Sequence, residues 1–249
     1  FEADGKGGVV EKAVDAGLAF SEGGQNVASM GPFAGDINRD GVLDLFIPDL
    51  NYCSLLINVK PGLWQHRAAQ SGISPMMGQY AGWGAVLFDY DHDGWLDIFT
   101  AHGNAHHEYV QEDTLARNKG DGTFEDVSSK SGAYFQQKYV GRGVSWADFD
   151  NDGDTDLLLN NMNDAARLLR NDGGNRRHWM NVEALLKFPT GTRHAIGARV
   201  TVVTGSLRQV EDVNPVRGYL SQGDPRLDFG LGDADYADLF EARGRQRSR

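Results

Sequence analysis

The chain of 249 residues is poor in cysteine and proline and has no long hydrophobic run. Its single thiol, Cys53, excludes an internal disulfide, and the strand-like run NYCSLLIN around it predicts a small buried residue. No stretch reaches the roughly 18 apolar residues that a membrane-spanning helix needs. The opening residues FEADGKGGVV lack the apolar core of a secretory signal, so we interpret the chain as a mature or truncated segment.

Basic residues are also scarce, because 24 Lys and Arg stand against 35 Asp and Glu, for a formal net charge of −11. A generic nucleic-acid-binding role is therefore disfavoured, since it depends on a basic surface that displaces counterions. Much of the acidic excess lies in three short segments. Three divalent ions bound there would cancel about half of the net charge.

What the sequence does contain is a repeated acidic nonapeptide. The copies are DINRDGVLD at 36–44 (loop one), DYDHDGWLD at 89–97 (loop two) and DFDNDGDTD at 148–156 (loop three). Each has a glycine five residues upstream (Gly31, Gly84 and Gly143), and each is followed by an apolar run.

A second landmark recurs between the loops. LINVKPGLWQHRAAQSG at 56–72 aligns with ARNKGDGTFEDVSSKSG at 116–132, so that Asn58 matches Asn118. Weaker copies end at Gly17 and begin at residue 168. Self-similarity at a fixed period predicts stacked supersecondary units.

The repeating unit is expected to be a small antiparallel sheet. Its apolar runs are short and rich in Val, Ile, Leu and Phe, and NKGDGTF is typical of a tight hairpin turn. Only 113–118 (DTLARN) offers a short helical pattern. Four short strands in 50 to 60 residues match a β-propeller blade, so the fold class is all-β with propeller blades.

The number of blades predicts an incomplete propeller. Three loops and a partial copy make about three to four blades, whereas propellers close with about four to eight. Either blades that precede this segment are missing, which we favour, or a partner chain covers the sheet edges.

The loops differ from an EF-hand, in which position 12 is a bidentate Glu and helices flank the loop. Here position 12 is Ile47, Thr100 or Leu159, and the residues that follow are strand-like. Coordination is therefore expected to end at position 9.

Positions 1, 3 and 5 can turn alternate oxygens toward one Ca²⁺, and the glycine at position 6 lets position 7 offer its carbonyl. The expected metal ligands are Asp36, Asn38, Asp40, the Val42 carbonyl and Asp44; Asp89, Asp91, Asp93, the Trp95 carbonyl and Asp97; and Asp148, Asp150, Asp152, the Asp154 carbonyl and Asp156. Solvated turns that bind nothing are the alternative, although carboxylates this close repel unless they are neutralised. Mg²⁺ is the weaker candidate, because it demands octahedral geometry and keeps its waters.

These loops resemble the FG-GAP/VCBS repeat family, whose blades carry a D-x-D-x-D-G-x-x-D calcium loop, as in the integrin α-subunit propeller. The family's F/W-G-D-F/Y entry stands here as FAGD, VLFDYD and WADFD. The resemblance implies propeller blades with about three structural calcium ions, and Asn38 is expected to weaken the first site.

Residues after 175 resemble the ASPIC/UnbV module, which follows FG-GAP repeats in many secreted bacterial proteins. The matching elements are AIGARV at 195–200, Gly218-Tyr219, Ser221-Gln222 and FGLG at 229–232. The family's closing Trp-Pro-x-Gly segment is absent, since the chain reads EARGRQRSR instead. We therefore expect blades over 1–175 and a small β module over 176–249, in which FGLG provides a close approach or a bulge.

A catalytic centre is not expected from the sequence, which contains no G-x-S-x-G motif and no local Ser/His/Asp grouping. His102, His106 and His107, with Glu108 and Glu112, form the best alternative cluster, and we interpret it as a loop between strands. Trp83, Trp95, Trp146 and Trp179 are expected to pack between blades rather than to form a ligand-stacking face.

The leading hypothesis is a calcium-binding scaffold outside the cytoplasm (extracellular, periplasmic or on the outer cell surface) that mediates protein or glycan contacts. Two alternatives are an accessory subunit of a larger membrane or redox assembly, and a hydrolase or lyase whose site lies in absent blades. The partner's identity and the oligomeric state are left open by the sequence.

Overall fold

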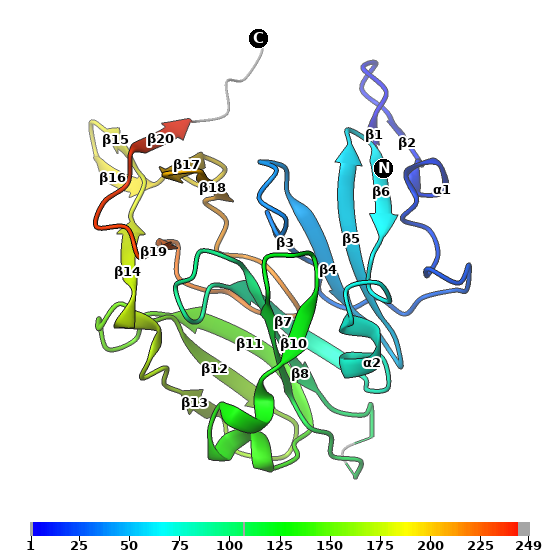
Figure 1. Ribbon diagram of the computed structural model, residues 1–249. Helices are drawn as coiled ribbons and strands as arrows, with labels where there is room; N and C mark the ends of the chain where they lie inside the picture. The colour runs from blue at the N-terminus through cyan, green and yellow to red at the C-terminus, as the bar shows by residue number, and fades with distance from the viewer. Residues whose placement is uncertain (1, 107, 244–249) are drawn as a thin grey trace.

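The computed structural model describes residues 2–106 and 108–243 and consists almost entirely of short antiparallel strands (Figure 1). Three sheets follow one another along the chain, and in each the strands pair in sequence order. Blade one contains β3 (Phe33–Gly35), β4 (Asp44–Pro48), β5 (Cys53–Lys60) and β6 (Leu63–His66); blade two contains β7 (Gly82–Phe88), β8 (Asp97–His102), β9 (Thr114–Asn118) and β10 (Phe124–Asp126); blade three contains β11 (Gly141–Ala147), β12 (Asp156–Asn161) and β13 (Arg167–Leu169). The predicted all-β fold with an incomplete set of propeller blades is confirmed.

The C-terminal module is built from three smaller sheets. β14 (His178–Val182) pairs with β19 (Leu227–Gly232), β15 (Leu185–Phe188) pairs with β16 (Gly191–His194), and β17 (Arg199–Thr204) lies between β18 (Leu207–Asp212) and β20 (Leu239–Arg243).

The remaining elements are short. They are β1 (Glu2–Ala3), β2 (Val9–Val10), α1 (Ala13–Ala16), α2 (Ile73–Met77), and the 3₁₀ turns η1 (Ser128–Lys130), η2 (Ala133–Gln136) and η3 (Gly174–Arg176). Among the described residues no helix has the length and apolarity that a membrane crossing requires.

The one segment with a short helical pattern, 113–118, is not helical, because Thr114–Asn118 forms β9 in the middle of blade two, in agreement with the predicted strands. Cross-strand pairing with β8 and β10 outweighs the weak local preference of so short a segment. The predicted hairpin turn after it is confirmed, with Gly120 and Gly122 at positive φ and the Lys119 amide donating to the Thr123 carbonyl.

The hydrophobic side chains gather in two cores, one among the three blades and one inside the C-terminal module. Phe46 in β4 and Phe99 in β8 occupy matching positions in blades one and two, and both are fully buried. Cys53 is buried as predicted, and burial raises the pKa of its thiol to about 12.

Segment 214–224 of the C-terminal module, here called the crossing segment, contacts blades one and three. The Gly218 amide donates to the Pro32 carbonyl at 3.3 Å, and the Asp224 amide donates to the Trp146 carbonyl at 2.9 Å. The blades and the module are therefore joined by backbone hydrogen bonds as well as by chain connectivity.

The crossing segment explains two of the glycines that precede the loops. A β-carbon at Gly31 would lie 2.5 Å from Cα of Tyr219, and one at Gly143 would lie 3.0 Å from Oγ of Ser221. A side chain at Gly31 would therefore collide with the backbone of the crossing segment, whereas one at Gly143 would need a small shift of the Ser221 side chain.

The predicted histidine cluster is not assembled into a site. His102 ends β8 and is buried, where its Nδ1 donates to the Glu112 carbonyl at 2.8 Å, whereas His106 is exposed in the loop that follows. The interpretation as a loop between strands therefore holds for His106 but is wrong for His102, and His107 lies outside the described residues. Burial lowers the pKa of His102 to about 4.

Replacing Phe46 by Ala is expected to lower the free energy of unfolding by about 3–5 kcal/mol, because it removes a fully buried ring and leaves a cavity. Urea denaturation measures the change. Phe20→Ala is the matched control, since that ring is 45% exposed and its loss should cost well under half as much. Equal effects of the two substitutions would contradict the assignment of Phe46 to the core.

His102 should make the protein sensitive to acid. Its pKa in the folded state lies below the ordinary value of 6.5, so the unfolded state binds the proton first and stability is lost as the pH falls from 6.5 toward 4. His102→Asn should remove about 2–3 kcal/mol of the difference in unfolding free energy between pH 7.5 and pH 4.5. Exposed His194 provides the control, and an unchanged pH profile in His102→Asn would refute the prediction.

Candidate metal centres

The three acidic loops occupy the same place in each blade, between its first and second strands. Inside every loop the position 1 carboxylate accepts a hydrogen bond from the amide of the position 6 glycine. The distances are 3.0 Å for Gly41 to Asp36, 2.6 Å for Gly94 to Asp89 and 3.2 Å for Gly153 to Asp148. The position 6 glycines have positive φ, which permits the chain reversal.

The position 9 carboxylates are held by two backbone amides each. One donor is the position 2 residue of the same loop, and the other is an asparagine in the third strand or just after it. The pairs are Ile37 and Asn58 on Asp44, Tyr90 and Asn118 on Asp97, and Phe149 and Asn171 on Asp156, at 2.7–3.1 Å. The asparagine landmark of the sequence thus fixes the last acidic residue of each loop.

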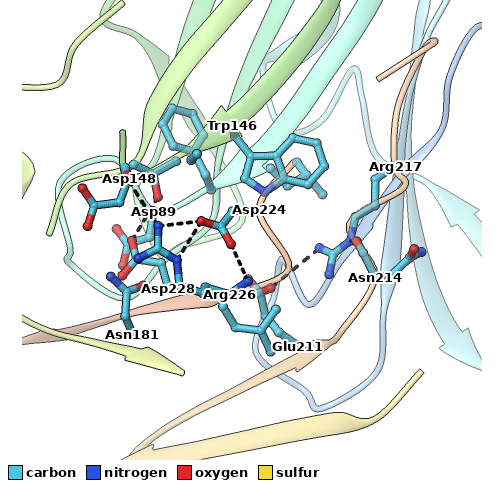
Figure 2. Close-up of a pocket in the computed structure, with 15 residues that line it drawn as sticks. Asp89, Trp146, Asp148, Asn181, Glu211, Asn214, Arg217, Asp224, Arg226 and Asp228 are labelled. Carbon is cyan, nitrogen blue, oxygen red and sulfur yellow. Dashed lines mark hydrogen bonds and ion pairs between the residues drawn. The ribbon is translucent and has the colours of Figure 1, made fainter. Parts of the chain in front are cut away.

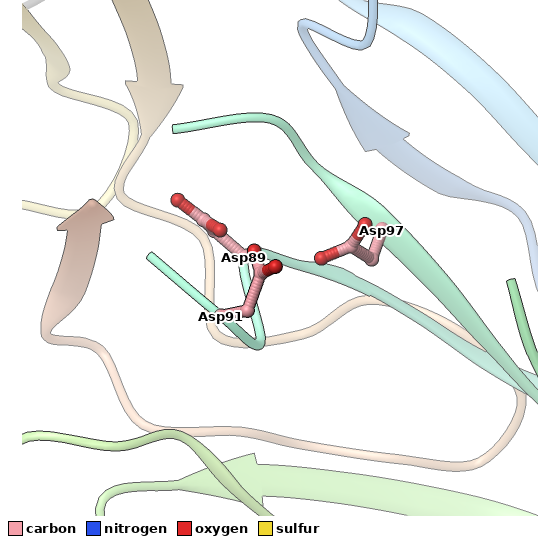
Figure 3. A group of neighbouring side chains, drawn as sticks. All are labelled: Asp89, Asp91 and Asp97. Atoms are coloured by element: carbon pink, nitrogen blue, oxygen red, sulfur yellow. The ribbon is translucent and has the colours of Figure 1, made fainter. Parts of the chain in front are cut away.

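Loop two brings Asp89, Asp91 and Asp97 together, with one oxygen of each within 4.8 Å of the others (Figure 3). Asp89 and Asp97 are buried, and among the described residues neither forms an ion pair with a lysine or an arginine. Burial raises the pKa of both carboxyls well above the ordinary value, and their neighbouring carboxylates add to the shift. A hard dication held among these oxygens would offset both the burial of the carboxylates and the repulsion between them.

Loop three forms the same arrangement with Asp148, Asp150 and Asp156, again within 4.8 Å of one another. Only Asp156 is buried, and burial raises its pKa. Asp152 occupies position 5 and accepts from the amide of Asp154, as Asp93 does from Trp95 in loop two. The third cluster is therefore more open than the second.

Loop one has Asn38 at position 3, whose side chain donates to Asp40 at 3.0 Å. Asp36 is 4% exposed, and its Oδ1 atom is buried without a hydrogen-bond partner. Burial is the main cause that raises the pKa of Asp36 to about 7 and that of Asp44 to about 6. The unpartnered carboxylate oxygen fits a metal ligand.

Three arginines surround loop two, and no local sequence pattern pointed to them. Arg117 donates to Asp91 at 2.9 Å and to Asp93 at 2.6 Å, Arg177 lies 3.2 Å from Asp91, and Arg39 of loop one donates to the Asp93 carbonyl at 3.2 Å. Arg117 and Arg177 thus pair with the outer carboxylates of the loop, and among the described residues no lysine or arginine forms an ion pair with Asp89 or Asp97.

Two asparagine side chains also connect neighbouring blades. Asn118 of blade two donates to the Ile37 carbonyl in loop one at 3.2 Å, and Asn171, just after β13, donates to the Tyr90 carbonyl in loop two at 2.8 Å. Their recurrence at matching positions was the available signal, but the sequence did not show that they reach the preceding loop.

The donor set fits a hard dication. The side-chain oxygens come from carboxylates and one amide, which are the ligands that Ca²⁺ prefers, and the loops contain no thiolate or imidazole ligand at the alternating positions. The carbonyls of Val42, Trp95 and Asp154 remain predicted ligands at position 7.

The tryptophans pack at junctions. Trp95 lies beneath the Arg39 guanidinium, 3.8 Å from the ring centre, and Trp83 lies beneath Arg142 at 4.1 Å. Trp146 packs edge-on against Phe33 of blade one.

Comparison with known proteins agrees with this geometry. Residues 89–159 match the FG-GAP-like repeat family, and residues 189–241 match the ASPIC and UnbV family. Cartilage acidic protein 1 of Homo sapiens is 30% identical over 152 residues, which cover 60% of this chain and 21% of that protein. The Xenopus tropicalis protein of the same name is 46% identical over 54 residues, or 22% of this chain and 8% of that protein.

The chain thus spans about a fifth or less of the length of the curated relatives that it matches. The FG-GAP-like match includes loops two and three, and the ASPIC and UnbV match lies within the C-terminal module. The chain therefore matches the FG-GAP-like repeat family and the ASPIC and UnbV family over two separate segments, and it is distantly similar to cartilage acidic protein 1.

Proposed function

We propose that the three loops bind Ca²⁺ and that the ions stabilise a scaffold for contacts with proteins or glycans outside the cytoplasm. The observation that carries the proposal is the clustering of three carboxylates in loops two and three, with buried Asp89 and Asp97 lacking an ion-pair partner among the described residues. Loop one repeats the hydrogen bonds of its position 1 and position 9 carboxylates, although its three aspartates are not gathered as closely. Burying an uncompensated carboxylate is costly, and the same cost repeated in register is best explained by a ligand.

The ions act structurally in this proposal. Each loop joins two strands of a blade, and its position 9 carboxylate also holds the third-strand asparagine. A cation that fixes positions 1, 3, 5 and 9 would therefore fix the relative placement of three strands. Calcium sites in extracellular modules bind with a Kd of about 10⁻⁴ to 10⁻³ M, which suits a calcium-rich compartment.

We also propose the division into blades over 1–175 and a C-terminal module over 176–249. Its support is the separation of the two hydrophobic cores, one formed by residues 33–169 and the other by residues 180–237. The similarity to cartilage acidic protein 1 supports a location outside the cytoplasm.

Calcium should raise the melting temperature of the chain. At a tenfold excess over Kd, each site contributes about 1.4 kcal/mol, so three sites contribute about 4 kcal/mol and roughly 10 °C. Calorimetric titration of the chelator-treated protein, followed by thermal unfolding with and without Ca²⁺, measures both quantities. Mg²⁺ at the same concentration should give a smaller shift, and an equal shift would argue against calcium selectivity.

Asp97→Asn should abolish the loop-two site and reduce the number of bound ions by one, because position 9 closes the coordination shell and carries a full charge. The calcium-dependent rise in melting temperature should fall by about a third. Asp164→Asn is the matched control, since that carboxylate is exposed and lies outside the loops. Unchanged stoichiometry in Asp97→Asn would exclude Asp97 as a ligand.

A further inference from the structure

The C-terminal module lies against the position 6 glycine of all three loops. In loop one the space beside Gly41 is filled by the guanidinium of Arg208 from β18, and in loop three the space beside Gly153 is filled by the ring of Trp179 from β14. In loop two, the space beside Gly94 is filled chiefly by the guanidinium of Arg39 from loop one, and a β-carbon there would also lie 3.3 Å from the Gly230 carbonyl of β19. Three strands of the module thus each contact one loop.

Gly230 of the FGLG motif makes the closest approach. A β-carbon on it would meet an Asp89 carboxylate oxygen and would lie 2.6 Å from the backbone of His92. The expected close approach at this motif is therefore confirmed, and the surface it approaches is a proposed calcium ligand.

His92, at position 4 of loop two, forms hydrogen bonds between loop two and β19 of the module. The ring is fully buried, with Nε2 2.8 Å from Asp228 Oδ2 and Nδ1 3.1 Å from the Gly174 carbonyl, and the His92 carbonyl accepts from the Gly232 amide at 3.1 Å. His92 has φ 51°, a left-handed conformation that is unfavourable in a non-glycine residue.

The same left-handed conformation recurs at position 4 of the other loops, in Arg39 with φ 59° and in Asn151 with φ 59°. The fold of the loop itself therefore imposes it. A loop that loses its shape would relax this residue and withdraw its side chain from the neighbouring element.

The seam between blades and module is strongly charged (Figure 2). Arg226 pairs with Asp224 at 2.6 Å and donates to the Asp148 carbonyl of loop three at 3.2 Å, while Arg217 lies 3.7 Å from half-buried Glu211. Asp89 and Asp228 line the same small cavity. An empty loop two places its uncompensated carboxylates directly beside those of the module.

We propose that calcium in the loops seats the C-terminal module on the blades, so that the module docks firmly only on occupied loops. The inference rests on the proposed calcium binding. Calcium would remove the repulsion between Asp89 and Asp228 and would hold His92 in its docked conformation. Binding linkage is reciprocal, so the factor by which calcium strengthens docking equals the factor by which docking strengthens calcium binding. A substitution that undocks the module should therefore weaken calcium binding.

The test compares the whole chain with Gly230→Ala in saturating Ca²⁺. Hydrogen exchange should become faster at 178–182 and 227–232 in the variant, while β7 and β8 keep their protection. Its calcium affinity, measured by calorimetry, should fall by about fivefold or more, the lower end of typical coupling. Gly23→Ala is the matched control, because a β-carbon there would lie no closer than 3.9 Å to any neighbour outside the adjacent residues.

A second variant, Trp179→Ala, removes the contact with loop three without adding atoms and should act in the same direction. Faster exchange of the module with unchanged calcium affinity in both variants would overturn the seating proposal while leaving calcium binding intact. Unchanged exchange and unchanged affinity in both variants would overturn it as well. Failure of the unaltered chain to bind Ca²⁺ would overturn the seating proposal and the proposed function together.

Discussion

The repulsion among carboxylates gathered within one turn is the constraint on which the structure depends. Asp89 and Asp97 are buried beside Asp91 and Asp93, and burial raises the pKa of both buried groups. Arg117 and Arg177 pair with the carboxylates at positions 3 and 5 of loop two, whereas Arg39 donates to the backbone carbonyl at position 5. The inner carboxylates are left facing one another, and a hard dication is the simplest group that satisfies them.

Each loop is also hydrogen-bonded to other parts of the chain, so a change in the shape of one loop affects the elements around it. The position 9 carboxylate ties a loop to the third-strand asparagine, and the asparagine side chains reach the preceding loop. The position 4 side chains contact the next unit along the chain. Arg39 of loop one donates to loop two, and His92 of loop two contacts Asp228 of the C-terminal module. Blade geometry and module docking consequently depend on the same three turns.

Much of the fold could be predicted because short sequence patterns determine it. The spacing of acidic residues around Gly41, Gly94 and Gly153 defines the loops, and the short β-branched runs define the strands. The segment 113–118 was locally ambiguous, because its strand conformation is fixed by pairing with β8 and β10, which lie outside any short sequence window.

The parts of the site that could not be predicted arise from distant segments. Arg117 and Arg177 are 60 residues apart, and only the fold brings both to Asp91. The glycines before the loops were visible as a repeat, yet their reason at Gly31 and Gly143 is the crossing segment, about 80 to 190 residues further along the chain. Repetition marks such positions, whereas their partners depend on tertiary packing.

The most direct measurement is anomalous diffraction from crystals of this chain grown with calcium. The account predicts three peaks, one inside each loop, with the ion in loop two bound by oxygens of Asp89, Asp91 and Asp97. Loops without any peak at saturating calcium, with the carboxylates turned to solvent, would contradict it.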